Sequence, residues 1–291
     1  MKKKSKSILI TGTSSGIGYH AAQTFLENGY RVFGSVRKEE DAQRLEKEFG
    51  SRVTPLVFDV CDEGAVQKAV ATVERELEDD GLGGLINNAG IAVGGPLLHL
   101  SKEVFRKQLE VNVWGQFNVI QAFLPLLGAR ENHLAAPGRL INISSVSGKL
   151  AYPFLVPYAA SKHALEALSH GLRRELLVYG IDVVIVGPGA VKTPIWDKGT
   201  EMGTYESTRY TKAIKDLKQY FRNVNQNALE PHFIAKKLVR IMEKKRPRAR
   251  YAFIPGNSLV SWTLPNLLPH RLLDRVLGRV MGLFDARTAE N

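Results

Sequence analysis

Seven short apolar runs, rich in strand-forming residues, alternate along this 291-residue chain with segments whose apolar residues return every three to four positions. Runs of the first kind are typical of buried strands, and the second spacing is typical of amphipathic helices. Strands that alternate with helices form a parallel sheet, because each right-handed crossover returns the chain to the same edge. The pattern therefore predicts an α/β fold: a doubly wound parallel sheet of about seven strands with helices on both faces.

The boundaries of these elements follow from the same patterns. We expect strands at residues 7–11, 31–36, 53–58, 84–87, 139–144, 182–186 and 250–254, and helices at 16–28, 39–49, 62–80, 112–127 and 158–179. No linker, low-complexity segment or internal repeat divides the chain, so we expect a single domain over residues 1–257. Residues 192–229 would form an inserted polar loop and helix in this domain, and residues 258–291 an apolar and basic extension.

Composition and charge narrow the class of protein. Apolar residues make up 44% of the chain, enough for a substantial core, and no stretch approaches the roughly 20 apolar residues of a membrane span. Cys61 is the single cysteine, so no intrachain disulfide can form, a reducing compartment fits best, and we expect no metal site. The net charge of +11 comes without a nucleic-acid-binding motif. We therefore expect a cytoplasmic protein with no nucleic-acid partner.

A glycine-rich turn follows the first expected strand. Its sequence, Thr11-Gly12-Thr13-Ser14-Ser15-Gly16-Ile17-Gly18, stands directly before a helix pattern. Glycines at this point permit a tight turn and let the backbone approach a pyrophosphate, while the free amides of the helix start supply hydrogen-bond donors. The kinase-type phosphate loop is excluded, because no Gly-Lys-Ser/Thr follows. The turn therefore predicts a dinucleotide-binding fold of the Rossmann type.

The end of the second strand distinguishes between the two nicotinamide cofactors. An acidic side chain there binds the ribose 2′-hydroxyl of NAD, and a basic one binds the 2′-phosphate of NADP. Arg37 and Lys38 follow the strand without an acid, which favours NADP(H) over NAD(H). The alternative is that both bases begin a solvated helix, where they pair with Glu39, Glu40 and Asp41.

Tyr158 and Lys162 begin a long helical pattern and, four residues apart, share one face of it. An ammonium beneath a phenol favours the phenolate, which would lower the tyrosine pKa from about 10 toward the working pH of a general acid/base. Of nine tyrosines, Tyr158 alone has a lysine four residues on. Ser145 ends another expected strand, where its hydroxyl could donate to a substrate oxygen. Asn112 would lie in the first turn of a helix, as a cap or as an amide that holds a water.

These motifs together resemble the short-chain dehydrogenase/reductase family over residues 7–195. The family's order and spacing are matched by Thr11-Gly-x3-Gly16-x-Gly18, Asn87-Asn-Ala-Gly90, Asn112, Ser145, Tyr158-x3-Lys162 and Pro188-Gly189. The resemblance implies an NADP(H)-dependent enzyme that transfers hydride between the nicotinamide and an alcohol or carbonyl substrate.

The resemblance also implies a role for each matched residue. Tyr158 would exchange a proton with the substrate oxygen, Ser145 would orient that oxygen, and Lys162 would lower the tyrosine pKa and bind the nicotinamide ribose. Asn112 would hold a proton-relay water. The cofactor would be bound by Gly12, Thr13, Ser14, Ser15, Gly16, Ile17, Gly18, Arg37, Asp59, Val60, Asn88, Ala89, Gly90, Tyr158, Lys162, Pro188, Gly189, Val191 and Thr193. Many NADP-using relatives carry a base where this chain has Ser15, so the 2′-phosphate assignment depends mainly on Arg37.

The late segments bear on the substrate. Residues 188–194, the Tyr152-Pro153 segment and the long apolar extension resemble those of hydroxysteroid and retinol dehydrogenases, which implies a lipophilic alcohol or ketone. A small polar carbonyl or a sugar is an alternative, as is an NAD(H)-dependent dehydrogenase of a small polar alcohol. A regulatory protein that senses NADP(H) without turnover is a further alternative.

The extension carries an apolar helical stripe, made of Leu272, Leu273, Val276, Leu277, Val280, Met281 and Phe284. A basic row of Arg271, Arg275 and Arg279 runs beside it. This face could pack on its own domain or on a subunit mate, or could contact a membrane surface through residues 258–284. In relatives, the helices that match 112–127 and 158–179 pair subunits, so the resemblance implies a homodimer or homotetramer.

Overall fold

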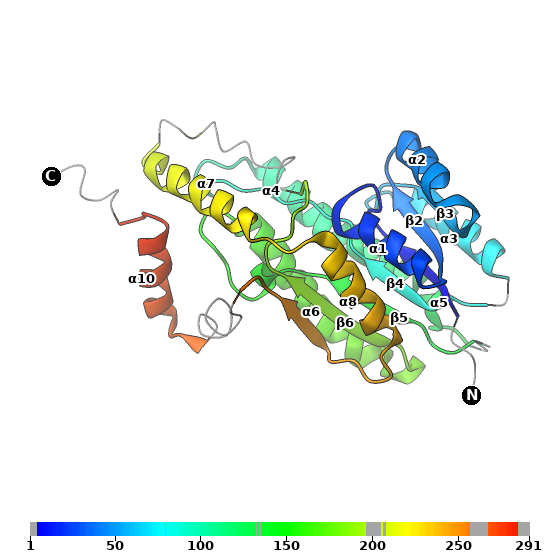
Figure 1. Cartoon of the computed structure of the whole chain (residues 1–291). Coiled ribbons are helices and arrows are strands. Elements are labelled where there is room, and N and C mark those ends of the chain that lie inside the picture. The colour runs from blue at the N-terminus through cyan, green and yellow to red at the C-terminus, as the bar shows by residue number, and fades with distance from the viewer. Residues whose placement is uncertain are drawn as a thin grey trace.

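The structure, a computed structural model, describes residues 5–78, 80–131, 133, 135–195, 205, 208–256 and 267–284. Seven strands form one parallel sheet in the order β3-β2-β1-β4-β5-β6-β7 (Figure 1). They are β1 (Ser7–Ile10), β2 (Arg31–Val36), β3 (Val53–Val57), β4 (Gly84–Asn87), β5 (Arg139–Ile143), β6 (Asp182–Pro188) and β7 (Arg250–Phe253). The predicted doubly wound sheet is confirmed, and the strand order reverses between β1 and β4.

Helices cover both faces of this sheet. The longer ones are α1 (Gly16–Glu27), α2 (Glu39–Phe49), α3 (Glu63–Leu77), α4 (Lys102–Leu109), α5 (Gln116–Leu127), α6 (Val156–Glu175), α7 (Thr211–Gln226), α8 (Pro231–Glu243) and α10 (His270–Val280). Figure 1 shows α1 and α8 side by side on one face, and α3, α5 and α6 pack on the other.

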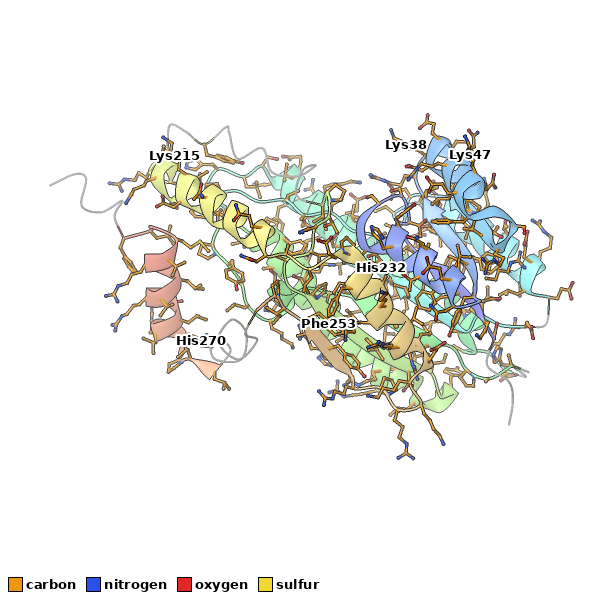
Figure 2. All side chains as sticks on the ribbon, viewed as in Figure 1. Lys38, Lys47, Lys215, His232, Phe253 and His270 are labelled. Atoms are coloured by element: carbon orange, nitrogen blue, oxygen red, sulfur yellow. The ribbon has the colours of Figure 1, made fainter. Side chains whose placement is uncertain are left out.

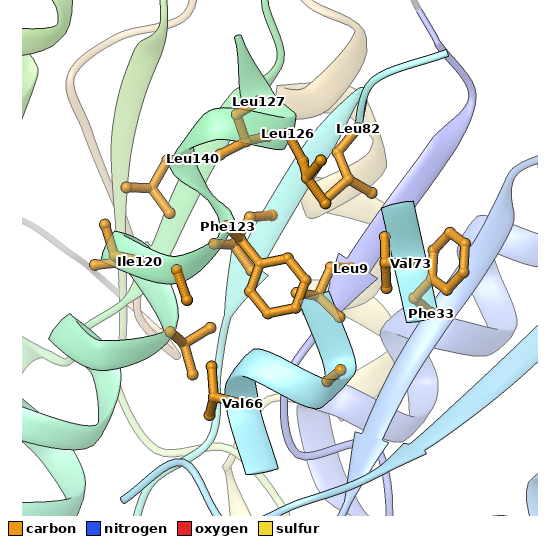
Figure 3. Packing of buried hydrophobic residues seen from close by; sticks show 14 of the residues in the cluster. Leu9, Phe33, Val66, Val73, Leu82, Ile120, Phe123, Leu126, Leu127 and Leu140 are labelled. Carbon is orange, nitrogen blue, oxygen red and sulfur yellow. The ribbon is translucent and has the colours of Figure 1, made fainter. Parts of the chain in front are cut away.

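The core is divided into two layers by the sheet. On β1, Ile8 and Ile10 face the layer under α1 and α8, while Leu9 faces the opposite layer, because successive strand residues point to opposite faces. Figure 3 shows Leu9 packed with Phe123 and its neighbours in the second layer. Since both faces are buried, the central strands are continuous apolar runs, as the sequence pattern indicated.

Two helices, α4 and α8, were not expected. A π-helical segment, Glu110–Gly115, joins α4 directly to α5. Asn112 therefore lies in the middle of a continuous helical run, and the prediction that it lies in the first turn of a helix was wrong. The apolar periodicity of α4 is weak, because Val104, Phe105 and Leu109 are its only apolar residues.

The late segments gather at one end of the molecule, where Figure 1 shows α10 beyond α7. Ala213, Ile214 and Leu217 of α7 pack with Phe154 and Met281 in a small separate cluster. Part of the expected insertion, residues 196–204, 206 and 207, lies outside the described residues, as do residues 257–266 and 285–291 of the carboxy-terminal region. Among the helices described, none has the length and apolar character needed to cross a bilayer.

Candidate active site

Two adjoining cavities open at the carboxyl edge of the sheet, with volumes of about 450 and 460 Å³. Their walls share Ile17, Asn88, Gly90, Thr193 and Ile195, so they form one continuous groove. The groove lies where the strand order reverses, which is the position at which open parallel α/β sheets bind their ligands.

The structure brings most of the predicted site residues to this groove. One end, which we call the nucleotide end, is lined by Gly12, Ser14, Ser15, Gly16, Ile17, Arg37, Asp59, Val60, Asn88, Ala89, Gly90 and Thr193. The other, which we call the reaction end, is lined by Ser145, Tyr158, Lys162, Pro188, Gly189 and Val191. Within the described chain, three predicted residues lie behind the walls: Thr13, Gly18 and Asn112.

The glycines of the first turn are required by backbone geometry. Gly12 and Gly16 have φ angles of +72° and +58°, a region that side chains strongly disfavour. A Cβ on Gly18 would lie 2.1 Å from the carbonyl oxygen of Gly12. The turn therefore requires glycine at these three positions, and the start of α1 lines the groove through Gly16 and Ile17.

Thr11 and Asn88 hold this turn against the end of β4. The Thr11 hydroxyl accepts hydrogen bonds from the backbone amides of Asn88 and Ala89, both at 2.9 Å, and the Asn88 amide donates to the Thr11 carbonyl at 2.9 Å. The Thr13 hydroxyl donates to the carbonyl of Ser35 at 3.0 Å, which explains why it faces away from the groove. Thr11 is part of the predicted motif, but no role was predicted for its hydroxyl, because a threonine that ends a strand carries no signal of its contacts.

Two arginines, Arg37 and Arg44, lie near the end of β2. Arg37 lines the nucleotide end, while Asp41, which the alternative interpretation paired with the bases at 37 and 38, forms its ion pair with Arg44 at 2.9 Å. Arg44 also donates to the carbonyl of Ser14 at 2.7 Å, so α2 is tied to the glycine turn. No local sequence pattern indicates this contact, because it joins residues 30 positions apart.

The reaction end is built from the start of α6 and the end of β5. Pro157 lies in the first turn of α6, and Tyr158 and Lys162 follow on one face with almost no exposure. Lys162 Nζ donates to the carbonyl of Ile143 at 2.8 Å and lies 5.8 Å from the centre of the Tyr158 ring. The Ser145 hydroxyl accepts from the backbone amide of Ser147 at 3.1 Å and forms a hydrogen bond with Tyr158.

Burial shifts the pKa values of both groups. It raises the pKa of Tyr158, and the hydrogen bond with Ser145 acts in the opposite direction. Burial lowers the pKa of Lys162 to about 8, with the Glu166 carboxylate acting against this shift. The predicted lowering of the Tyr158 pKa is wrong for the protein alone, because burial dominates the shift. At neutral pH the phenol therefore carries its proton.

Asn112, in the π-helical segment, hydrogen-bonds the backbone of Ile91, a residue that lines the groove. Its amide accepts from the backbone N–H of Ile91 and donates to the Ile91 carbonyl, both at 2.9 Å, and donates to the Ser161 hydroxyl at 3.1 Å. Gln108 holds Val93 and Ile91 in the same way, at 2.8 and 2.9 Å. π-turns frequently occur at functional sites, and this one joins the groove to α6.

Apolar side chains complete the reaction end. They come from separate parts of the chain: Tyr152, Leu155, Ile195, Ile254, Pro255 and Met281. Of these, Tyr152 belongs to the segment whose sequence resembles that of hydroxysteroid and retinol dehydrogenases, and Met281 belongs to the apolar stripe of the extension. No local pattern indicates that the others line a cavity, because each is an ordinary apolar residue near the end of an element.

Comparison with known proteins identifies the family. A family model described as short chain dehydrogenase matches residues 6–203. NADPH-dependent 3-dehydrocapnine reductase of Ornithobacterium rhinotracheale is 40% identical, over 92% of this chain and 94% of the relative. Retinol dehydrogenase 5 of Homo sapiens is 34% identical, over 94% and 88% of the two chains.

Solved structures agree with this assignment. A short-chain dehydrogenase from Streptomyces avermitilis superposes with a TM-score of 0.74 at 26% identity, covering all of both chains. A short chain dehydrogenase from Burkholderia cenocepacia, solved in complex with NADP, gives a TM-score of 0.70 at 25% identity and covers 95% of this chain and 99% of the other. This chain therefore belongs to the short-chain dehydrogenase family of oxidoreductases, whose substrates are alcohols and carbonyl compounds.

Proposed function

We propose that this protein reduces the carbonyl group of a lipophilic ketone or aldehyde with NADPH, and that Tyr158 donates the proton. The observation that carries the proposal is a buried phenol, hydrogen-bonded to Ser145, in a cavity lined largely by apolar side chains; burial raises the pKa of this phenol. A phenol that keeps its proton at neutral pH suits reduction, since reduction consumes a proton at the substrate oxygen.

NADP(H) is the cofactor that the nucleotide end fits. The compact glycine turn lets a pyrophosphate approach the backbone at the start of α1, and Arg37 lies where a 2′-phosphate would need a cation. Asp59 and Val60 would flank the adenine, and Asn88 to Gly90 the adjoining ribose. The relatives named as NADPH-dependent or solved with NADP support the same choice. When bound, the nicotinamide supplies the hydride.

Other residues at or near the reaction end would orient the substrate, bind the nicotinamide and hold a water. Ser145 would hydrogen-bond and orient the substrate oxygen, and Lys162 would bind the nicotinamide ribose. Asn112 would hold a relay water through its backbone carbonyl, because Ile91 and Ser161 already engage its side-chain amide. Pro188 to Thr193 would cover the nicotinamide from the end of β6.

Replacement of Tyr158 by Phe tests the proton donor. We expect kcat to fall by a factor of roughly 10² to 10⁴, the usual contribution of a positioned acid/base, with NADPH affinity retained. Tyr179→Phe, which removes a phenol from an exposed site, serves as the control. Rates would be followed by NADPH absorbance and affinity by NADPH fluorescence. Full turnover by the Tyr158→Phe protein would refute the role.

The apolar wall supports a lipophilic substrate, as do relatives named for 3-dehydrocapnine and for retinol. We expect kcat/KM to rise with the apolar length of ketones in a graded panel run with NADPH beside NADH. A preference for small polar carbonyls, or for NADH, would contradict the substrate class or the cofactor but leave the reaction intact. Tight NADP(H) binding without turnover on any compound would favour the regulatory alternative.

Exposed apolar side chains support assembly into a homodimer or homotetramer. Trp114 precedes α5 and is 53% exposed, and Leu177 and Val178 follow α6 and are 73% and 79% exposed. Association through these helices would cover them. Sedimentation velocity of the wild type and of Val178→Asp would test this, with dissociation to monomers expected for the variant.

A peripheral membrane contact is proposed for the outer face of α10. Leu272, Val276 and Val280 lie one turn apart on this helix and are 45%, 43% and 55% exposed, with the arginine row beside them. Met281, by contrast, is buried against the domain. Co-sedimentation with anionic vesicles should be lost in Val276→Asp, and equal binding by both proteins would exclude the contact.

A further inference from the structure

A buried carboxylate lies one helical turn beyond Lys162 and has no part in the proton exchange proposed above. Glu166 is on α6, and its side chain is 2% exposed. An ionised carboxylate in such a place is costly unless cations and hydrogen-bond donors surround it. Its partners therefore indicate what it does.

The partners of Glu166 come from the end of β5 and from β7. The Ser144 hydroxyl donates to one carboxylate oxygen at 2.9 Å, and Nε of Arg250 lies 3.0 Å from both oxygens. A second nitrogen of Arg250, Nη2, donates to the carbonyl of Ser145 at 3.3 Å. The pair of Glu166 and Arg250 thus binds both residues at the end of β5, one of which is the proposed substrate-orienting serine.

Two glycines provide the space for this network. A Cβ on Gly148 would lie 2.6 Å from the Ser144 hydroxyl and 2.9 Å from Cγ of Glu166. A Cβ on Gly187 would lie 2.6 Å from Nη2 of Arg250. Neither glycine has a positive φ, so both are needed for the space around Glu166 and Arg250 rather than for a turn.

We propose that Glu166, paired with Arg250, is a positioning residue: it fixes the end of β5 that carries Ser145 and supplies the negative charge that faces the Lys162 ammonium. This inference rests on the proposed function, because it assigns Glu166 a role only through Ser145 and Lys162. Neither Glu166 nor Arg250 needs to touch substrate or cofactor for this role.

Several charged or titratable groups lie beside Lys162 or beside its neighbour Glu166. Tyr158 and Glu166 lie on its own helix, Arg250 lies on β7, and Lys149 approaches Glu166 at 3.5 Å from beyond the end of β5. His170, one turn after Glu166, has a lowered pKa, chiefly because of burial. The Glu166 carboxylate raises the pKa of Lys162 against the effect of burial. Removing it should lower that pKa further, and removing the Arg250 guanidinium should raise it.

The test compares pH profiles of kcat/KM for reduction. Of Tyr158 and Lys162, Lys162 has the lower pKa, so its deprotonation should set the alkaline limb. We expect Glu166→Gln to move this limb to lower pH, and Arg250→Gln to move it to higher pH, each by about half a unit or more. Glu175→Gln, an equal charge change at the exposed end of α6, should leave the limb in place.

A measurement without turnover gives the same comparison. Lys162 faces the expected ribose site, so the pH dependence of NADP⁺ affinity, measured by calorimetry on the same proteins, should shift in the same directions. If Glu166→Gln does not fold, Arg250→Gln carries the test alone, because the charge argument predicts an upward shift and a purely structural role predicts none.

The outcomes separate the two proposals. Limbs that stay in place, or that both move to lower pH, would overturn the role of Glu166. If Tyr158→Phe is inactive while the limbs do not move, this inference fails and the proposed function stands. If Tyr158→Phe retains turnover, the proposed function itself fails.

Discussion

The nucleotide end and the reaction end of the groove are built in different ways. The nucleotide end is made of backbone, compacted by Gly12, Gly16 and Gly18 within one short stretch. The reaction end is made of buried side chains, above all Tyr158 and Lys162, whose surroundings come from several distant segments. A short motif can encode a backbone shape, whereas the pKa of a buried group depends on residues that the sequence does not bring together.

The largest effect on cofactor binding should come from crowding the backbone at the nucleotide end. In Gly18→Ala, the new Cβ would meet the Gly12 carbonyl oxygen and the Asn88 amide, at 2.1 and 2.6 Å, so the turn must open. We expect NADPH affinity to fall at least about 100-fold, a loss of roughly 3 kcal/mol, as measured by fluorescence titration. A variant with unchanged affinity would show that the turn is not the binding element.

The matched control for this substitution is Gly171→Ala. Gly171 lies within α6, and a Cβ there meets no atom within 4 Å. Cofactor affinity should stay at the wild-type value, and thermal stability should rise by about 0.5 to 1 kcal/mol, since alanine is the better helix former.

Replacement of Lys162 at the reaction end should affect turnover and stability in opposite directions. In Lys162→Met, we expect turnover to fall by a factor of roughly 10² to 10⁴, while the free energy of unfolding below pH 8 stays equal or rises. Burial lowers the lysine pKa to about 8 from 10.5, so folding with a charged lysine costs about 3 kcal/mol below pH 8. Between pH 8 and 10.5 the lysine is protonated in the unfolded chain and neutral in the folded protein. The free energy of unfolding therefore rises with pH over this range, and the cost is lost.

Urea unfolding at pH 7.5 and pH 10 would check the sign. The wild type should gain free energy of unfolding relative to Lys162→Met between pH 7.5 and pH 10, because the wild type alone loses the cost of burying a charged lysine. Lys68→Met, at an exposed position on α3, should show no such change. A variant that is less stable at pH 7.5 and equally so at pH 10 would contradict the predicted cost of burial.

The smallest effect should be confined to cofactor choice. In Arg37→Gln, we expect NADPH to bind about 10- to 100-fold more weakly, the usual range for a hydrogen bond to a charged group, while NADH affinity stays the same. Lys47→Gln removes a positive charge near the far end of α2 from Lys38 (Figure 2) and should change neither affinity. Equal losses for both cofactors in Arg37→Gln would place the 2′-phosphate elsewhere.

The same contrast explains how much of the protein could be predicted from its sequence. The strand pattern and the glycine turn were predictable, because apolar runs, tight turns and parallel crossovers follow from local chemistry. Most predicted binding residues do line the groove, from Gly12 to Arg37 and Asp59. The direction of the Thr13 side chain could not be predicted, because the motif gives positions only: the hydroxyl donates to Ser35 and faces away from the groove, so a cofactor contact of Thr13 stays a prediction for its backbone.

The reaction end was less predictable. The direction of the Tyr158 pKa shift was wrong, because the helical spacing of Lys162 gives its distance along the chain but not the desolvation of the phenol. The network of Glu166 and Arg250 joins residues 84 positions apart, so no local pattern reveals it. Asn112 was assigned to the wrong part of a helix, because the weak apolar periodicity of α4 left the helix before it unpredicted.

The order of the strands has a consequence for engineering. Arg37 follows β2 and Ser145 follows β5, with β1 and β4 between them. At the usual spacing of neighbouring strands, about 14 Å separate β2 from β5, more than the roughly 10 Å over which salt screens charges at 0.1 M. The cofactor preference and the proton transfer therefore depend on separate parts of the groove. Redesigning the loop after β2 should change which nicotinamide cofactor this enzyme uses without changing the pKa values at the reaction end.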